Sequence, residues 1–226
     1  MRATKVTTIV VGTAATCSGL IWTAASLTGS ADTDSKPPVA CSYTPSDGAK
    51  SVVIPAYDAS AAARPYTAKL VTNKGTITIE ALTDKAPCTT NSFSFLARKG
   101  FYVGSKCHRL TTQQIFVLEC GDPKGARKGD PGYFFADENL TGAVYPAGTV
   151  AMSKVIPGKN GSRFFISYAD PQLRMPSAWT PFGRVVSGLS VLKEIAKGGT
   201  QNGLSDGRPK KDLVIKSVTV QQAANR

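Results

Sequence analysis

Short strand-like segments separated by turn residues dominate this sequence and restrict its fold more than any other feature. Residues 69–72 and 76–80 alternate polar and apolar side chains around Asn73-Lys74-Gly75, a β-hairpin pattern in which glycine can take a positive φ. Further strands are expected at residues 106–110, 115–121, 149–153, 163–167, 182–186 and 213–220. So many short strands favour an antiparallel barrel or sandwich.

Two segments have a helical pattern instead. The first opens at Ala86-Pro87, where the missing N–H of proline costs nothing, and ends at Gly100. The second covers residues 187–196 and is closed by Gly198-Gly199. Both carry apolar residues on one side, so each is expected to pack against the sheet.

The N-terminal residues 1–31 have the order of a secretory signal. Arg2 and Lys5 precede a mostly uncharged run over residues 6–27, and the small residues Gly29-Ser30-Ala31 follow. The run is about long enough to span a bilayer, so an uncleaved membrane anchor stays open. Lipidation at Cys17 is a third alternative. In each case the body lies outside the cytoplasm, secreted or held at the cell envelope.

Residues 32–64 are rich in proline, serine and alanine, with little periodicity, and are expected to form a linker arm. Residues 65–226 are expected to form one domain. Of the 226 residues, 42% are hydrophobic and only 19% charged, which indicates a folded globular body.

The net charge of +12 suggests nucleic acid or anionic envelope polymers as partners. The basic residues are scattered, however, with no run longer than Arg208-Pro209-Lys210-Lys211, and no nucleic-acid-binding motif occurs. Nucleic acid is therefore not expected as a partner. A basic binder of envelope polymers remains an alternative.

Three ordered blocks resemble the cyclophilin family. His108-Arg109, Phe116 and Gly121-Asp122 resemble its active-site strand pair, and residues 160–166 (NGSRFFI) and 180–185 (TPFGRV) continue the resemblance. It covers roughly residues 66–221 and is similar to the exported actinobacterial type. It implies a mainly β fold, a closed eight-stranded antiparallel barrel capped by two helices. It also implies a monomeric peptidyl-prolyl cis-trans isomerase without a cofactor, acting on exported or envelope proteins and assisting their folding.

The chemistry that the resemblance implies needs neither a nucleophile nor a metal. The barrier to rotation about a peptide bond is about 18–20 kcal/mol, so a site need only favour the twisted amide. The resemblance assigns to Arg109 the hydrogen bond to the prolyl nitrogen, since its donors stay charged at any working pH. It implies a proline pocket formed by Phe116, Val117, Phe165 and Leu173, with His108 at its edge. The other substrate-binding residues that it implies are Glu119, Ser153, Lys154, Arg163 and Trp179.

Two departures from the family pattern concern the site itself. Glu119 and Arg163 stand where the family usually has glutamines close to the catalytic arginine. In one interpretation they form an ion pair with each other and keep the net charge of the site. In the other, Glu119 pairs with Arg109 and takes its donors away from the substrate. An alternative function is therefore a proline-peptide binding module with low or no turnover.

The cysteines of the body, Cys41, Cys88, Cys107 and Cys120, allow three disulfide pairings. Cys107 and Cys120 lie at symmetric ends of two strands expected to be neighbours, which favours 107 with 120 and 41 with 88. A zinc site is the rival, but no C-x-x-C occurs and one histidine is a poor supply of ligands. No metal is expected.

Overall fold

The computed structural model describes residues 40–46, 53–123, 130–154 and 156–223. The expected signal segment, residues 1–31, and Cys17 lie outside this part of the chain. None of the helices within it has the length and apolar character needed to cross a bilayer.

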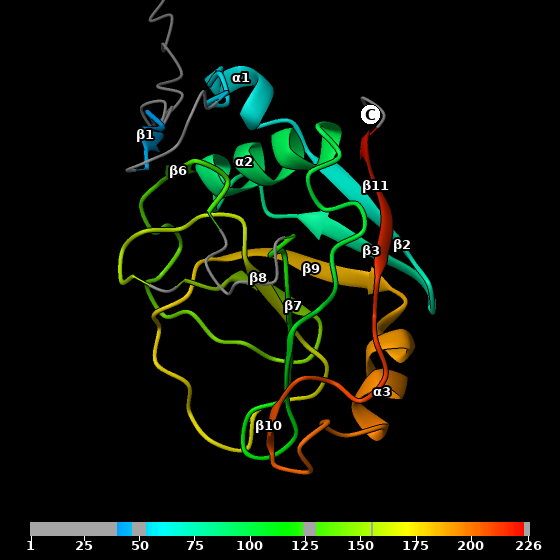
Figure 1. The fold of residues 1–226 in the computed structure, drawn as a ribbon. Helices are drawn as coiled ribbons and strands as arrows, with labels where there is room; N and C mark the ends of the chain where they lie inside the picture. The colour runs from blue at the N-terminus through cyan, green and yellow to red at the C-terminus, as the bar shows by residue number, and fades with distance from the viewer. Residues whose placement is uncertain (1–39, 47–52, 124–129, 155, 224–226) are drawn as a thin grey trace, which may run out of the picture. The chain divides into compact units, whose positions relative to one another are not determined.

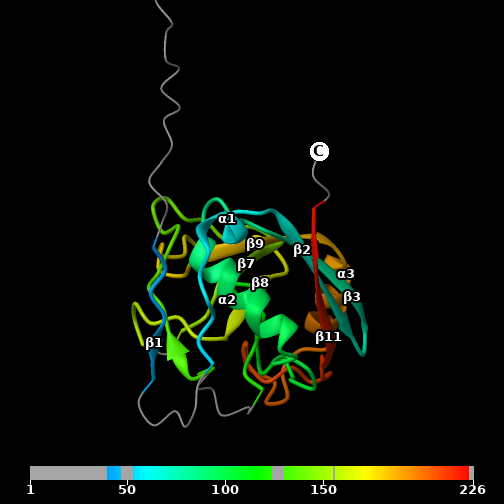
Figure 2. The same cartoon turned by 90° about the horizontal axis from the view of Figure 1, so that it is seen from above.

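Among the described residues, nine strands form one curled antiparallel sheet (Figures 1 and 2). Their order across the sheet is β10 (Asp206–Gly207), β4 (Arg109–Thr111), β5 (Val117–Cys120), β8 (Phe164–Ser167), β7 (Thr149–Met152), β9 (Pro181–Ser187), β3 (Gly75–Ala81), β2 (Tyr66–Thr72) and β11 (Ile215–Gln222). The expected mainly β, antiparallel architecture is confirmed.

The strand count and the closure differ slightly from the expected eight-stranded barrel. The residues just before β4 form backbone hydrogen bonds with the residues just before β11. Lys106 and Val214 form an antiparallel bridge, and Cys107 N donates a hydrogen bond of 3.0 Å to Leu213 O. The two sides of the sheet thus meet through these segments. Strand β4 begins at Arg109, three residues later than expected.

Side-chain alternation gives the curled sheet an apolar interior. The inward residues of β4, β5, β7 and β8 are almost completely buried: Leu110, Leu118, Val150, Phe164 and Ile166. Because successive residues of a strand point to opposite faces, their neighbours must lie on the outer face. The outer face is where the candidate site is built.

Two helices pack against the sheet, as the sequence predicts. They are α2 (Pro87–Arg98) and α3 (Leu189–Lys197), and a short α1 (Ala59–Ala62) precedes β2. The N-terminus of α2 lacks a capping side chain of its own, and Glu138 accepts hydrogen bonds from Cys88 N (3.0 Å) and Thr89 N (2.7 Å). A carboxylate there satisfies otherwise unpaired N–H groups and complements the helix dipole.

The described part of the proline-rich arm packs against the body. Tyr43 belongs to the core cluster, and its hydroxyl donates to Cys88 O at 2.8 Å. A disulfide joins Cys41 to Cys88, with Cα atoms 5.4 Å apart. Next to it, β1 (Thr44–Pro45) pairs with β6 (Tyr133–Phe134). The described part of the arm is therefore held to the body by a covalent bond and by burial.

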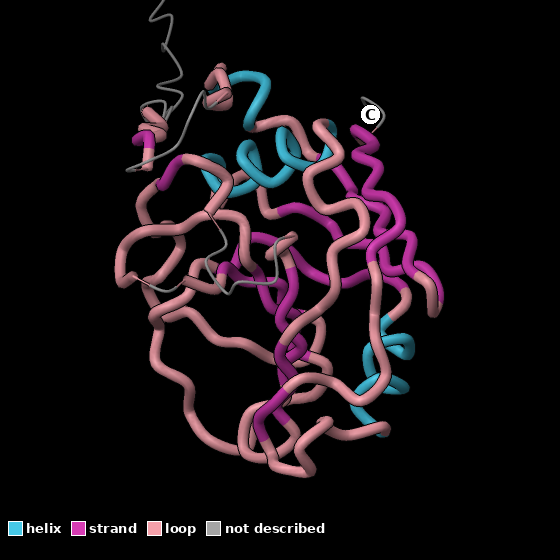
Figure 3. The backbone as a smooth tube through the Cα atoms, in the orientation of Figure 1, coloured by secondary structure: helices cyan, strands magenta, loops and turns pink. Residues whose placement is uncertain are grey.

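Long connections without helix or strand lie on one side of the molecule (Figure 3). One runs from β6 to β7 and another from β8 to β9. They carry Tyr145, Met175 and Trp179 onto the outer face of the sheet. These loops complete the surface on which the candidate site lies.

Candidate active site

One row of side chains crosses the outer face of four neighbouring strands. Arg109 of β4 is opposite Glu119 of β5, Glu119 is opposite Phe165 of β8, and Phe165 is opposite Ala151 of β7. Directly paired residues project to the same face of a sheet. The register therefore places an arginine, a carboxylate and an aromatic ring in sequence on one surface.

Glu119 is the centre of the polar half of this row. Its residue surface is only 2% exposed, and Oε1 accepts a hydrogen bond from Ser153 Oγ at 2.7 Å. The same oxygen pairs with Arg163 Nη2 and lies 3.3 Å from His108 Nε2. A buried carboxylate is costly unless it is paired and hydrogen-bonded, and these contacts supply both.

Both contacts considered for Glu119 from the sequence occur together. Its pairing with Arg163 is the closer one, while Oε2 lies 3.4 Å from Nη1 of Arg109. Burial, and then the charge of Arg109, lower the pKa of the Arg163 guanidinium. The two residues that replace the family's glutamines thus form an ion pair, and Glu119 also contacts the arginine assigned to catalysis.

Arg109 has a second carboxylate partner that the sequence analysis missed. Its Nε donates to Asp206 Oδ1 at 2.9 Å, and its Nη2 donates to Asp206 Oδ2 at 2.7 Å. The Arg109 side chain remains 35% exposed and borders a hollow of about 490 Å³. Asp206 is 97 residues further along the chain, so no local pattern could have indicated this contact.

The apolar half of the site is a separate cluster on the outer face. Val117, Ala151 and Phe165 contribute from the strands, and Tyr145 and Met175 from the long loops. Trp179 packs against the cluster, with its ring 6.1 Å from that of Phe165 in an edge-to-face arrangement. Sequence reasoning missed Tyr145 and Met175, because they lie outside the motifs and only tertiary packing brings them here.

Phe116 and Leu173 are not part of this cluster, although the resemblance places them with Phe165. Phe116 packs against the main core, its ring 5.9 Å from that of Tyr168. Alternation along the strand explains the difference, because Phe116 precedes Val117 and so faces the other side. Leu173 is 41% exposed.

Lys154 and His108 each lie beside a carboxylate. Lys154 Nζ lies 2.6 Å from both carboxylate oxygens of Asp137, and its side chain is only 9% exposed, so its charge is already paired. His108 is 5% exposed, and its Nε2 lies 3.3 Å from Oε1 of Glu119. Both residues therefore contribute to the internal polar structure of the site region.

The second disulfide flanks the polar half of the site. Cys107 and Cys120 are bonded, with Cα atoms 4.0 Å apart, and each precedes or follows a strand residue of the site by one or two positions. Both disulfides have the pairing expected from the sequence.

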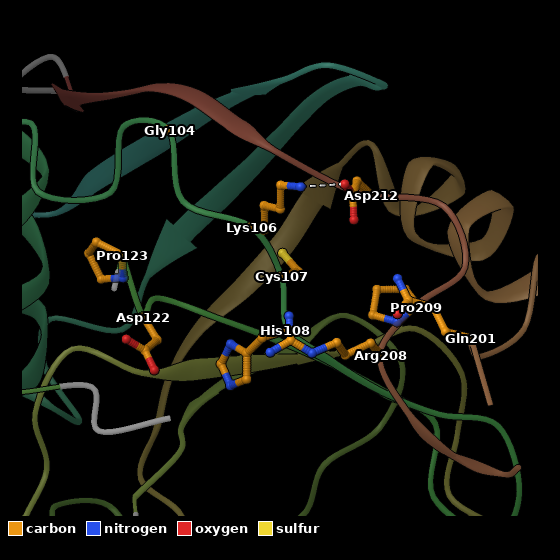
Figure 4. A pocket seen from close by; sticks show the side chains of 10 residues that line it. All are labelled: Gly104, Lys106, Cys107, His108, Asp122, Pro123, Gln201, Arg208, Pro209 and Asp212. Atoms are coloured by element: carbon orange, nitrogen blue, oxygen red, sulfur yellow. Dashed lines mark hydrogen bonds and ion pairs between the residues drawn. The ribbon is translucent and has the colours of Figure 1, made fainter. Parts of the chain in front are cut away.

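A cavity of about 340 Å³ lies next to His108 (Figure 4). Lys106 and Asp212 form an ion pair of 2.6 Å on its wall, and the side chain of Arg208 extends towards His108. Within the described ranges, no group of three His, Cys, Asp or Glu residues could hold a metal ion.

The fold and the site define the class of protein. Residues 67–220 match the family "Cyclophilin type peptidyl-prolyl cis-trans isomerase/CLD", and the chain belongs to this family. It is similar to "Probable peptidyl-prolyl cis-trans isomerase B" of Mycobacterium tuberculosis, with 43% identity over 163 residues that cover 66% of this chain and 52% of the relative. The corresponding Mycobacterium leprae protein is 41% identical over 80% of this chain and 66% of its own length.

The chain thus spans about half the length of the Mycobacterium tuberculosis relative. A Schizosaccharomyces pombe peptidyl-prolyl cis-trans isomerase is 38% identical over 67% of this chain and 97% of its own length. Two solved structures of a Cryptosporidium parvum cyclophilin have the same fold, with TM-scores of 0.61 and 0.59 and identities of 24% and 25%. They cover 71% and 70% of this chain and 99% of their own.

Proposed function

We propose that this protein catalyses cis-trans isomerisation of X-Pro bonds in polypeptides. Family membership supports the reaction class, and the outer-face row supports the chemistry. The observation that carries the proposal is the position of Arg109, partly exposed and in the same cross-strand row as Phe165, with Glu119 between them. A proline ring on the apolar cluster would have its nitrogen on the side of the guanidinium.

The reaction requires the site to favour a twisted amide. Twisting breaks amide resonance and localises a lone pair on the prolyl nitrogen, over a barrier of about 18–20 kcal/mol. A hydrogen bond from Arg109 to this nitrogen is stronger in the twisted state than in either planar isomer, so it lowers the barrier. Val117 and Phe165 would hold the ring while the rest of the substrate rotates.

Arg109 has more N–H donors than its contacts to Asp206 and Glu119 use. A guanidinium has five N–H donors, and the contacts to Asp206 and Glu119 engage one donor on each of its three nitrogens. One N–H on each of Nη1 and Nη2 has no partner among the described residues. These two groups could reach a bound peptide.

The substrate class follows from the same site. One of the Cryptosporidium parvum cyclophilin structures was determined in the presence of the dipeptide Ala-Pro, and its fold is that of this chain. We infer that this chain likewise binds proline-containing segments, as a monomer, without a cofactor.

The setting we propose is outside the cytoplasm. Two disulfides are typical of proteins that fold in oxidising compartments, and the order of residues 1–31 is that of an export signal. The clients would then be exported or envelope proteins whose folding waits for prolyl isomerisation. A membrane would be contacted only through the N-terminal segment, where this is not cleaved.

An isomerisation assay on a proline peptide tests the proposal. Arg109→Ala is expected to lower kcat/KM by about 10²- to 10³-fold, as removal of one key hydrogen-bond donor does in other enzymes. Arg184→Ala is the control, since Arg184 forms an exposed ion pair with Glu80 on the neighbouring part of the sheet. An Arg109→Ala variant as active as the parent would refute the assigned role.

The second candidate is a proline-peptide binding module with little turnover. The observation in its favour is that Glu119 and Asp206 already occupy three donors of Arg109. A parent protein that binds the peptide but does not accelerate isomerisation would support the module over the enzyme.

A further inference from the structure

We propose that Asp206 is a positioning residue that fixes the plane of the Arg109 guanidinium for the reaction. The inference rests on the proposed function, and it adds a residue that neither the family motifs nor the sequence pattern indicates. Asp206 acts through Arg109 and is not itself expected to touch the substrate.

The contact is of the kind that orients an arginine. The Asp206 carboxylate spans the Nε and Nη2 edge of Arg109 side-on, with oxygen distances of 2.9 Å and 2.7 Å and a third contact of 3.2 Å. Parallel hydrogen bonds of this type restrict both the distance and the plane of the guanidinium. The opposite terminal nitrogen, Nη1, points to Glu119. Two carboxylates therefore hold two sides of one flat group.

The backbone places Asp206 independently of this ion pair. Asp206 is opposite Thr111 in the pairing of β10 with β4, and Thr112 N donates to Ser205 O at 2.8 Å. At the base of the loop, Gln201 N donates to Arg208 O at 2.8 Å. Asp206 is thus carried on a closed, hydrogen-bonded loop laid along the strand of Arg109. Main-chain hydrogen bonds fix the position of the Asp206 backbone, and its short side chain places the carboxylate next to Arg109.

Charge balance gives a reason for a second carboxylate. Arg109 and Arg163 both contact Glu119, which provides one negative charge for two positive ones. Asp206 supplies the second negative charge at the solvent side, where its side chain is 53% exposed. With Asp206 removed, Arg109 could move towards Glu119 and away from the prolyl nitrogen.

The contribution to stability is expected to be small. Ion pairs with partners this exposed typically contribute between about 0 and 1 kcal/mol. Asp206→Asn should therefore fold like the parent protein. An effect on catalysis can then be separated from an effect on folding.

The test compares Asp206→Asn, Asp206→Glu and the matched control Asp212→Asn. Asp212 lies in the same C-terminal part of the chain and pairs with Lys106, without contact to Arg109. For Asp206→Asn, kcat/KM on a proline peptide is expected to fall by about tenfold or more, since small misplacements of a reacting group are costly. The Kd of the peptide should be nearly unchanged. Asp206→Glu, which keeps the carboxylate, should recover most of the rate.

Two further measurements decide the outcome. In an Arg109→Ala background, Asp206→Asn should have no additional effect on the rate, because Asp206 acts only through Arg109. The NMR signal of the Arg109 Nε–H should be slow to exchange in the parent and in Asp212→Asn, and fast in Asp206→Asn. This signal reports the contact whether or not the protein is an active enzyme.

The results also distinguish failure of this inference from failure of the proposed function. If Arg109→Ala lowers kcat/KM as expected but Asp206→Asn leaves it unchanged, or lowers it by the same factor in the parent and in the Arg109→Ala variant, Asp206 is not a positioning residue and the proposed function stands. If the parent protein is inactive while the Nε–H signal depends on Asp206, the contact is structural, and both the catalytic function and the positioning role are refuted.

Discussion

At the scale of single residues, the buried Glu119 decides how this site differs from the family pattern. A carboxylate and a guanidinium replace two neutral amides, and they pair with each other beneath the surface. Buried pairs of this kind are not in themselves evidence of stability, because desolvation offsets the attraction. Their effect on the site is to add a negative charge beside Arg109.

Restoring the family residues tests this exchange. Glu119→Gln with Arg163→Gln is expected to leave kcat/KM unchanged or to raise it, because the pair is removed as a unit and Arg109 loses a competing acceptor. A large loss of activity in the double variant would contradict both interpretations of the exchange. The measurement is the peptide isomerisation rate at a temperature where both proteins are folded.

The single change Arg163→Gln should behave differently. It leaves the Glu119 carboxylate buried without its closest cation, which is expected to lower the free energy of unfolding by on the order of 3 kcal/mol. Arg184→Gln, at the exposed pair with Glu80, is the control and should change stability by less than about 1 kcal/mol. Denaturant unfolding of the two variants checks the prediction, and equal effects would argue against it.

At the scale of elements, the two disulfides join different parts of the fold. Cys107–Cys120 joins the flanks of the strand pair that carries Arg109 and Glu119, whereas Cys41–Cys88 joins the arm to helix α2. Both constrain the unfolded chain, but only the first lies beside the site. Stability and activity should therefore respond differently to their removal.

Cys107→Ser with Cys120→Ser is expected to cost roughly 3 kcal/mol of stability and to lower kcat/KM, since the strand pair under Arg109 loses its covalent closure. Cys41→Ser with Cys88→Ser should cost a similar or larger amount, roughly 4 kcal/mol, because its loop is longer, and should leave kcat/KM unchanged. Denaturant midpoints and isomerisation rates of the folded proteins are compared. Equal losses of activity in both variants would show that the first disulfide has no special relation to the site.

At the scale of the whole molecule, buried tyrosines make the free energy of unfolding depend on pH. Burial raises the pKa of both Tyr133 and Tyr168 to about 12, and their hydroxyls are hydrogen-bonded to Ser92 and to Thr111 O. Unfolded tyrosine titrates near pH 10, so the neutral phenol is favoured in the folded state. The resulting stability is fully present below pH 10 and is lost as the pH rises to about 12.

The free energy of unfolding is therefore expected to fall between pH 10 and about 12. Tyr168→Phe cannot ionise, so its fall over this range should be smaller than that of the parent. Denaturant unfolding at several alkaline pH values measures the difference. Identical pH dependence in the two proteins would contradict a contribution from Tyr168.

How far the fold could be predicted depends on the length of each element. The hairpin of β2 and β3 and helices α2 and α3 follow from periodicity over seven or more residues. Strands β1, β6 and β10 have two residues each, too few to show any period. They form because distant segments pair, and a strand of this length has no local signal to detect.

The amino-acid sequence by itself determined a mainly antiparallel β fold and the local order of Arg109, Val117, Glu119 and Phe165, because alternation and motif spacing are properties of neighbouring residues. The barrel was implied by the resemblance to the cyclophilin family, and the disulfide pairing was favoured among three that the sequence allowed. Only the tertiary structure decided which partners Glu119 and Arg109 take, and that Tyr145, Met175 and Asp206 join them. The physical reason is that contacts between residues tens of positions apart depend on strand register and loop packing, which the cooperative burial of the whole core sets.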